Sequence, residues 1–419
     1  MRGDNQLQEK LAETITGEID RLAPELTELS HEIHDHPELG FEEYRAVELI
    51  TGLLKRHGFQ TEENYCGLPT AFRARKRGRR ADGPRLSFLA EYDALRGVGH
   101  GCGHNLIAAC STGAFLGLAA VMEEFEGEIS LIGTPAEEGG AGKVILLERG
   151  GFEDVEYALM MHPSSGGPKQ NLVARGGRAS GTVTVIFHGK AAHSSFPAGG
   201  INALNSAVSV FNQIDLMRPC LEVQDNINGV ILEGGTAGNI IPERAVCEFC
   251  IRAATMKRVQ ELIKLVTDCA GRAGELTGAV PEIRTERIYA ERYPNLPMCM
   301  AFKRHMEELG VEMHFPDPDR QYGSSDIGNV SIQIPAIHDY LSISGSQTLQ
   351  AHSKEYARAA AEPEADRMLL LGAKGLALTG ADIMADRHFR DEIQEYHRKQ
   401  VPEIYRKAGQ SGKAEGEET

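Results

Sequence analysis

Short apolar segments that alternate with longer helical segments constrain the fold of this chain more than any other feature. Ser87–Ala90, Ile129–Thr134 and Tyr157–Met161 have the character of strands, and Asn105–Glu124 and Lys143–Arg149 that of the intervening helices. Strands that are connected through helices usually pair side by side in parallel. The pattern therefore predicts an α/β domain with a mostly parallel central sheet flanked by helices.

A second pattern interrupts this alternation near Ala179. Strands and helices then follow in the order β-α-β-β-α-β, which is typical of a compact ferredoxin-like α+β unit of about a hundred residues. After roughly Arg292 the first pattern resumes and ends in a long helical stretch, Glu364–Leu378. A chain of 419 residues also exceeds what one hydrophobic core usually fills. We therefore predict a discontinuous α/β domain, residues 1–178 and 292–419, and an inserted lid or dimerisation domain, residues 179–291.

Charge and composition limit the classes of partner. The 44 basic and 60 acidic residues give a net charge of −16, which argues against a nucleic-acid partner because such a protein needs a basic face. No apolar signal segment follows Met1, and the apolar stretch Leu106–Met122 is short for a bilayer, so a buried helix is predicted there and no membrane contact. Eight scattered cysteines favour free thiols in a reducing cytoplasm. The polar end after Lys407 is predicted to be disordered.

Two residues that can bind a metal lie in a glycine-rich loop after the first of these strands. The segment His100-Gly101-Cys102-Gly103-His104-Asn105 opens the next helix. Open α/β sheets bind ligands at the carboxyl ends of their strands, so Cys102 and His104 are placed to share a metal ion. The alternative is a glycine-rich turn that holds a cysteine with no role in binding.

Carboxylates and a further histidine follow the next two strands. Glu137 and Glu138 stand in the segment Thr134-Pro135-Ala136-Glu137-Glu138-Gly139-Gly140. Adjacent glutamates usually form a solvated run of charge, but in a strand-end loop one can bind a metal while the other accepts a proton from water. His162 ends the third strand and would be structural if it stood alone. Three strand ends that carry Cys/His, Glu/Glu and His together predict a metal site.

These motifs resemble a known family when they are taken in order. GHGCGHN, PAEEGG, MHP and the late AHS are similar to the motifs of the co-catalytic metallopeptidases and amidohydrolases that include the aminoacylases, carboxypeptidase G and the auxin-conjugate hydrolases. HEIHDHPELGFEE, residues 31–43, resembles the opening signature of the branch with a cysteine ligand. Tyr322–Ser331 resembles the branch that contains p-aminobenzoyl-glutamate hydrolase and the β-alanyl-lysine dipeptidases. The likeness extends from about His31 to Asp382.

The resemblance implies two divalent metal ions, zinc or manganese, and assigns their ligands residue by residue. The implied ligands are Cys102, His104, Glu138, His162 and His352. Glu137 matches the general base of the family. Better-known members carry a His-x-Asp motif where this chain has Glu91-Tyr92-Asp93. Cys102 is therefore expected to take over part of the coordination, and Asp93 is not assigned as a ligand.

The inserted domain and the Tyr322–Ser331 segment are implied to complete the site. In the family the lid domain mediates dimerisation, and its histidine, here His193, reaches the active site of the partner subunit to steady the oxyanion. Asn239 and Arg252 are expected to hold the carbonyl or carboxylate groups of the substrate. Ser324 and Ser325 are also expected to contact it. For Arg252, an ordinary surface charge on a strand remains the alternative.

The sequence thus predicts a metal-dependent hydrolase, acting as a homodimer on the amide bond of a small dipeptide or an N-acyl or N-aroyl amino acid. Glu137 would be its general base and metal-activated water its nucleophile. Serine hydrolase chemistry is disfavoured because the sequence has no Gly-x-Ser-x-Gly elbow. Two alternatives stay open: a catalytically silent metal-binding or scaffold homologue, and a peptide carrier whose metal is structural.

Overall fold

The computed structural model describes residues 2–405 and divides the chain into two compact units. The first unit extends to Gly176 and resumes at Tyr293, and the second comprises Gly177–Arg292. The segment after Lys407, for which we predicted disorder, lies outside the described residues.

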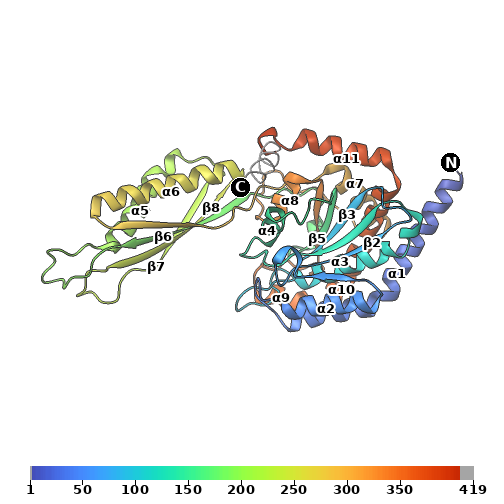
Figure 1. The fold of residues 1–419 in the computed structure, drawn as a ribbon, viewed down its shortest axis with the longest axis horizontal. Helices are drawn as coiled ribbons and strands as arrows, with labels where there is room; N and C mark the ends of the chain where they lie inside the picture. The colour runs from blue at the N-terminus through green and yellow to red at the C-terminus, as the bar shows by residue number, and fades with distance from the viewer. Residues whose placement is uncertain (1, 406–419) are drawn as a thin grey trace, which may run out of the picture. The chain divides into compact units, whose positions relative to one another are not determined.

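The first unit is built on a six-stranded sheet in the order β1-β2-β4-β3-β5-β10. Its strands β2, β3 and β5 are labelled in Figure 1. Its strands are β1 (Thr61–Glu63), β2 (Phe72–Arg77), β3 (Arg85–Ala90), β4 (Glu128–Gly133), β5 (Tyr157–Ser164) and β10 (Ala336–Ser342). The pairs β3–β4, β3–β5 and β5–β10 are parallel. The predicted α/β class with a largely parallel sheet is therefore confirmed.

Side chains that alternate along the strands enter two separate cores, one on each face of the sheet. In β3, Leu86, Phe88 and Ala90 belong to one core and Leu89 to the other. The larger core is shared with the helices α1 (Arg2–Asp35), α2 (Tyr44–Arg56), α3 (His104–Ala119), α7 (Leu296–Glu308) and α10 (Pro363–Ala385). The smaller core is shared with α4 (Gly142–Glu148) and α8 (Ile327–Gln333). Two further helices of this unit are α9 (Lys354–Ala359) and α11 (Arg387–Gln400).

The strands β1 and β2 were not predicted. They pair with each other and with β4 in antiparallel fashion at one side of the parallel strands. β1 has only three residues and β2 reads FRARKR, so neither carries the apolar run that signals a buried strand. β2 is nonetheless buried over Phe72–Ala74, where Arg73 forms an ion pair with Asp154.

The second unit has a four-stranded antiparallel sheet in the order β7-β8-β6-β9, with a core of its own. Its elements are β6 (Ala179–His188), α5 (Ala203–Met217), β7 (Asn226–Glu233), β8 (Arg244–Ala253), α6 (Met256–Thr277) and β9 (Val280–Thr285). The predicted β-α-β-β-α-β order is confirmed. Side-chain caps begin both helices: Asn202 accepts from the backbone N–H of Asn205, and Thr255 from that of Arg258.

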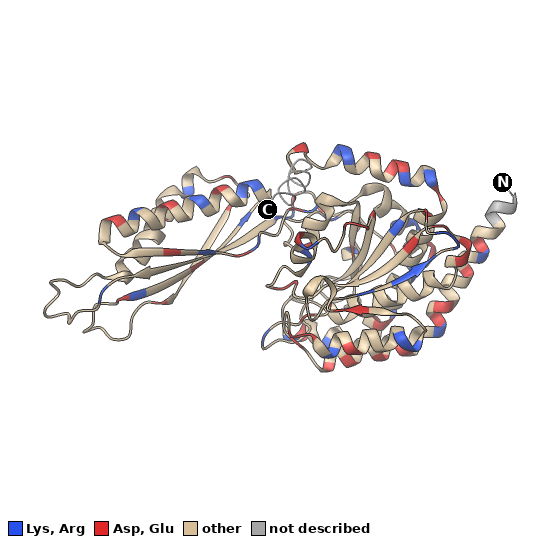
Figure 2. Ribbon diagram, in the orientation of Figure 1, with Lys and Arg blue, Asp and Glu red and all other residues tan. Residues whose placement is uncertain are grey.

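Two apolar helices lie at the centre of the first unit. Every residue of α3 is buried, in agreement with the buried helix predicted for this stretch. Among the described residues, α10 is the one helix long and apolar enough to cross a membrane, and 67% of its most apolar 18-residue window is buried inside the fold. In contrast, α6 and α11 carry interspersed acidic and basic residues (Figure 2).

Candidate metal centre

The site lies at the carboxyl ends of the parallel strands. Glu91 and Asp93 follow β3 directly, Glu137 and Glu138 follow β4, and His162 lies near the end of β5. Because these strands are parallel neighbours, their carboxyl ends share one edge of the sheet. Residues that are up to 71 positions apart in the sequence are thereby brought into one cluster.

The glycine-rich loop before α3 brings Cys102 against two histidines. Its Sγ lies 3.7 Å from His162 Nε2 and 3.6 Å from His352 Nε2. Gly103 has a φ of +74°, and a Cβ at this position would come within 2.6 Å of Pro163. A glycine is therefore needed for the loop to approach the end of β5 so closely.

His352 enters the site from a segment that no strand of the sheet directly precedes. Its backbone N–H donates to Gly101 O at 2.9 Å, and its φ of +62° is unusual for a residue with a side chain. This conformation directs Nε2 to within 3.7 Å of Glu138 Oε1. Both the backbone and the side chain of His352 thus contact the glycine-rich loop that contains Cys102.

The adjacent glutamates occupy different positions in the cluster. Glu138 Oε1 lies near both His352 Nε2 and His104 Nε2, at 3.7 and 3.9 Å. Glu137 is the more buried of the two, and its Oε2 lies 4.0 Å from His104 Nε2. Burial and the negative charges on Glu91 and Glu138 raise the pKa of Glu137 well above its usual value. A carboxyl group with a raised pKa is suited to taking up and releasing a proton.

Asp93 orients its neighbours. Its Oδ1 accepts from His104 Nδ1 at 2.9 Å, and its Oδ2 accepts the backbone N–H of Glu138 at 2.8 Å. With a proton on Nδ1, the lone pair of His104 lies on Nε2, which faces the cluster. The aspartate therefore fixes both the tautomer of His104 and the start of the glutamate loop.

Glu43, from the opening signature of the sequence, supports the same loop. Its Oε1 accepts the backbone N–H of Ala136, the residue before the two glutamates, at 2.8 Å. Ala136 has a φ of +57°, so this hydrogen bond helps to hold a strained turn. Burial and the nearby charge of Asp93 raise the pKa of Glu43 to about 7.

The donor atoms form three overlapping groups, within each of which they lie no more than 4.8 Å apart. The groups are Cys102-His104-His162, Cys102-Glu138-His352 and Glu91-His104-Glu137. Thiol, imidazole and carboxylate donors are the usual ligands of zinc, and they also suit other divalent transition metals. Within residues 2–405, His104 Nε2 and Glu138 Oε1 are buried without a hydrogen-bond partner. The cluster therefore fits divalent metal ions.

The protonation of Cys102 and His104 points to the same need for bound cations. Burial and the charge on Glu138 raise the pKa of the Cys102 thiol, so a thiolate here requires a cation to stabilise it. Burial alone would lower the pKa of His104, but the charges on Asp93 and Glu91 raise it well above its usual value. The shift of His104, which runs against the effect of burial, shows an excess of negative charge inside the cluster.

A buried ion network beside the glutamates was missed by sequence reasoning. Lys143, in α4, bonds to Glu91 Oε2 and, at 2.7 Å, to Asp326 Oδ1, and all three residues are fully buried. Burial alone would lower the pKa of Lys143, but the two carboxylates raise it. The one available signal was a lysine at the start of the apolar run Lys143-Val144-Ile145-Leu146-Leu147.

Asp326 lies in the branch-specific segment that also contains Ser324 and Ser325. The side-chain oxygen of Ser325 is buried without a hydrogen bond to any described residue. Because Asp326 pairs with Lys143, this segment is tied to the strand-end loops. The proposed contact of the two serines with substrate stays a prediction.

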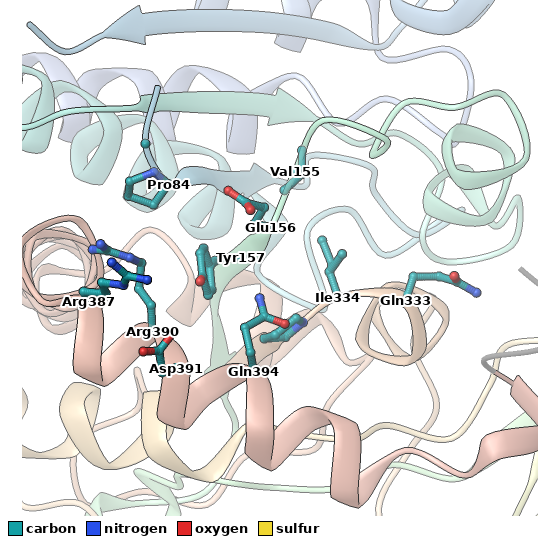
Figure 3. Close-up of a pocket in the computed structure, with 12 residues that line it drawn as sticks. Pro84, Val155, Glu156, Tyr157, Gln333, Ile334, Arg387, Arg390, Asp391 and Gln394 are labelled. Carbon is teal, nitrogen blue, oxygen red and sulfur yellow. The ribbon is translucent and has the colours of Figure 1, made fainter. Parts of the chain in front are cut away.

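A hollow elsewhere on the first unit is not this site (Figure 3). It is lined by Pro84, Val155–Tyr157 and Gln333–Pro335, which lie just before or at the starts of β3, β5 and β10, and by residues of α11. It therefore lies at the amino ends of these strands, whereas the metal-binding residues lie at their carboxyl ends.

His193, Asn239 and Arg252 belong to the second unit. The backbone N–H of Ser194 donates to Asn239 O at 3.0 Å, so the His193 and Asn239 loops lie side by side. The side chain of His193 is exposed, and its Nδ1 accepts the N–H of Ser195 at 3.1 Å, which leaves Nε2 as the donor. Arg252 lies on β8, opposite Ser180 and Asn226.

Comparison with known proteins gives consistent matches. A family model described as a peptidase dimerisation domain matches residues 173–276. An Xaa-Arg dipeptidase from Mus musculus is 37% identical over 381 residues, which cover 87% of this chain and 87% of that protein. One of the two p-aminobenzoyl-glutamate hydrolase chains of Escherichia coli K12 is 28% identical over 307 residues, covering 68% of this chain and 62% of that protein. The predicted resemblance to this hydrolase is confirmed.

A solved structure matches the fold over most of the chain. It is that of a dinuclear metal-binding peptidase of the M20 family from Bacillus subtilis, with a TM-score of 0.61 at 20% identity. The match covers 84% of this chain and 98% of that protein.

Proposed function

Because this chain belongs to the M20 peptidase family, we propose that it is a metal-dependent hydrolase that cleaves the amide bond of a small dipeptide or of an N-acyl or N-aroyl amino acid. The observation that carries this proposal is the convergence of thiol, imidazole and carboxylate donors at one edge of the sheet, beside a second, buried carboxyl group. A closed structural metal site would have no use for that additional carboxyl group.

Two divalent ions would be held by Cys102, His104, Glu138, His162 and His352. Cys102 belongs to two of the three donor groups, which supports a role in holding both ions. The mixed sulfur, nitrogen and oxygen donors are compatible with zinc and with manganese.

Glu137 would carry the proton through the reaction. When bound, the two cations lower the pKa of a water molecule and polarise the amide carbonyl. Glu137 accepts a proton from the attacking water and delivers it to the departing amine. Its burial keeps competing solvent away from the carboxyl group, and its neighbours supply the charges that set its pKa.

Dipeptides that end in arginine are the first substrate class to test. The mouse relative named an Xaa-Arg dipeptidase aligns with 87% of this chain. The net charge of −16 also favours the approach of a cationic substrate over that of an anionic one. Asn239, Arg252, Ser324 and Ser325 are proposed to contact the carbonyl and carboxylate groups of the substrate.

Metal removal should abolish the activity. We expect the metal-loaded protein to hydrolyse at least one member of a panel of Xaa-Arg dipeptides, p-aminobenzoyl-glutamate and N-acetyl amino acids. Treatment with a chelator should remove this turnover, and zinc or manganese should restore it. Amine release with parallel measurement of metal content checks both expectations. A protein that binds metal but hydrolyses none of these compounds would instead be a silent homologue or a carrier.

The second unit is proposed to form a homodimer through α5 and the edge strand β7. Both elements expose apolar side chains: Val208 and Leu216 on α5, and Val230 and Leu232 on β7. An edge strand also presents unpaired backbone groups. In such a dimer, His193 of the partner subunit would donate a hydrogen bond from Nε2 to the carbonyl oxygen of the substrate.

We expect the protein to sediment as a dimer and the Leu232→Lys variant to sediment as a monomer. The matched control is Val280→Lys, because Val280 is similarly exposed but lies on β9, the opposite edge of the sheet. Analytical ultracentrifugation distinguishes the two states. A wild-type monomer, or dimers of equal stability in both variants, would contradict this interface.

A cytoplasmic location is the remaining part of the proposal. All eight cysteines carry free thiols, and the proposed ligand Cys102 must stay reduced to bind metal.

A further inference from the structure

We propose that Glu91 is an additional metal ligand, on the His104 side of the centre, and that Lys143 is the residue that positions it. The proposal rests on the proposed function, since it concerns how the same metal centre is built. It adds a residue to the five ligands that the family resemblance assigns.

The first argument is the position of two buried lone pairs. Glu91 Oε1 and His104 Nε2 lie 3.4 Å apart, and neither forms a hydrogen bond with any residue in the described range 2–405. Asp93 accepts the proton of His104 Nδ1, so Nε2 can face the carboxylate oxygen only with a proton or a metal ion between the two atoms. The neutral form of His104, with its lone pair on Nε2, is the form that binds a metal ion, and the ion then takes the place of that proton.

The separation of these atoms agrees with shared coordination. A tetrahedral ion with bonds of about 2.0–2.2 Å to nitrogen and oxygen holds neighbouring ligand atoms about 3.3–3.5 Å apart. The 3.4 Å between Glu91 Oε1 and His104 Nε2 falls in this range, whereas the nearest oxygens of Glu137 and Glu138 lie 4.0 and 3.9 Å from the same nitrogen. Of these three carboxylates, Glu91 is therefore the one already placed as a neighbouring ligand of His104.

The second argument is the way Lys143 holds the other oxygen of Glu91. Lys143 Nζ bonds to Glu91 Oε2 and to Asp326 Oδ1, and Asp326 Oδ2 accepts the backbone N–H of Lys143 at 2.9 Å. Lys143 is thus fixed through both its side chain and its backbone. Because Oε2 is occupied, the rotamer of Glu91 is set with Oε1 toward His104.

The third argument is the balance of charge. Five carboxyl groups surround this point, from Glu91, Asp93, Glu137, Glu138 and Asp326, and Glu91, Asp93 and Asp326 are buried. Lys143 supplies one positive charge against them, and a protonated His104 would supply a second. Buried charges persist in proteins only when they are paired or coordinate a metal, so the cluster requires more positive charge than Lys143 supplies. A cation bound between Glu91 and His104 supplies it where the unpartnered atoms lie.

The test measures metal affinity in two variants and two matched controls. Glu91→Gln keeps the shape of the side chain but weakens the proposed ligand, and Lys143→Met removes the ammonium group. Asp339→Asn alters another fully buried carboxylate, and Arg73→Met removes another buried cation, whose partner Asp154 is partly exposed. Equilibrium dialysis against manganese or zinc, with elemental analysis, gives the number of ions and their affinities. Circular dichroism confirms that each variant is folded.

We expect the wild type and both controls to bind two ions per chain. Glu91→Gln should weaken one of the two ions by about 100-fold, and Lys143→Met should weaken the same ion by about 10–100-fold, as is typical for the partners of metal ligands. Two ions of wild-type affinity in a folded Glu91→Gln variant would overturn the assignment of Glu91 as a ligand but would leave the proposed hydrolase function standing. A wild-type protein that binds no metal would overturn the proposed function as well.

If Glu91→Gln does not fold, the wild-type protein decides the question. Anomalous diffraction from metal-loaded crystals locates each ion. Glu91 Oε1 within about 2.0–2.2 Å of an ion supports the proposal. An ion bound to His104 without Glu91 overturns it.

Discussion

Replacement of Glu137 by glutamine is expected to give a folded protein that keeps its metal ions but turns over substrate about 10²–10⁴-fold more slowly. The amide retains the size of the side chain, but it cannot accept a proton from the attacking water. Glu137 Oε2 lies 4.0 Å from His104 Nε2, farther than Glu91 Oε1 at 3.4 Å, so its loss as a base should leave the closer donors in place. Most of the effect should fall on kcat, because proton transfer occurs in the chemical step.

The neighbouring glutamate provides the contrast for this experiment. Glu138→Gln should lose metal affinity together with activity, because Glu138 Oε1 lies between His104 and His352. Steady-state kinetics and metal analysis of the two variants separate a base from a ligand. Normal turnover in Glu137→Gln, or loss of metal from that variant alone, would refute the assignment of Glu137.

The parts of the site that sequence reasoning anticipated are those tied to the parallel sheet. Cys102, His104, Glu137, Glu138 and His162 each follow or end a strand with an obvious apolar run. The rule that parallel strands gather their carboxyl ends at one edge is enough to bring these residues together. The geometry of the cluster therefore follows from local patterns combined with one rule of topology.

His352 and the ion network show where such reasoning stops. The position of His352 depends on a positive φ and on a hydrogen bond to Gly101, neither of which leaves a mark in the sequence. Lys143 and Asp326 are 183 residues apart and meet only because α4 and the Tyr322–Ser331 segment pack on the same face of the sheet. Pairs of buried charges that are distant in the sequence follow no periodic pattern, so the sequence alone does not predict them.

In the second unit, too, local sequence patterns were enough to predict the order of the elements. Its β-α-β-β-α-β order was evident because each element has a clear period and a turn or cap at its end. In the first unit, β1 and β2 escaped notice because short, charged strands gain their order from the neighbouring β4 and not from their own propensity.

Replacement of Cys102 by serine should have the broadest effect on the metal centre. Its Sγ contributes to both donor groups that contain His162 and His352, so the substitution should weaken both ions, whereas Glu91→Gln should weaken one. A hydroxyl group is a poorer donor than a thiolate for zinc and related metals, and loss of a direct ligand should cost more than about 100-fold in affinity, beyond the usual effect of an outer partner.

Absorption spectroscopy of the cobalt-substituted protein tests whether Cys102 is a ligand. Cobalt bound to the wild-type protein should show a thiolate-to-metal absorption band, and Cys102→Ser should lack it. Cys250→Ser is the matched control, because Cys250 is a half-buried thiol in the second unit and in none of the donor groups. It should retain the band, both ions and full activity. A Cys102→Ser protein with the same band and two ions of wild-type affinity would show that the sulfur is not a ligand. The contacts of Cys102 with His162 and His352 would then be structural.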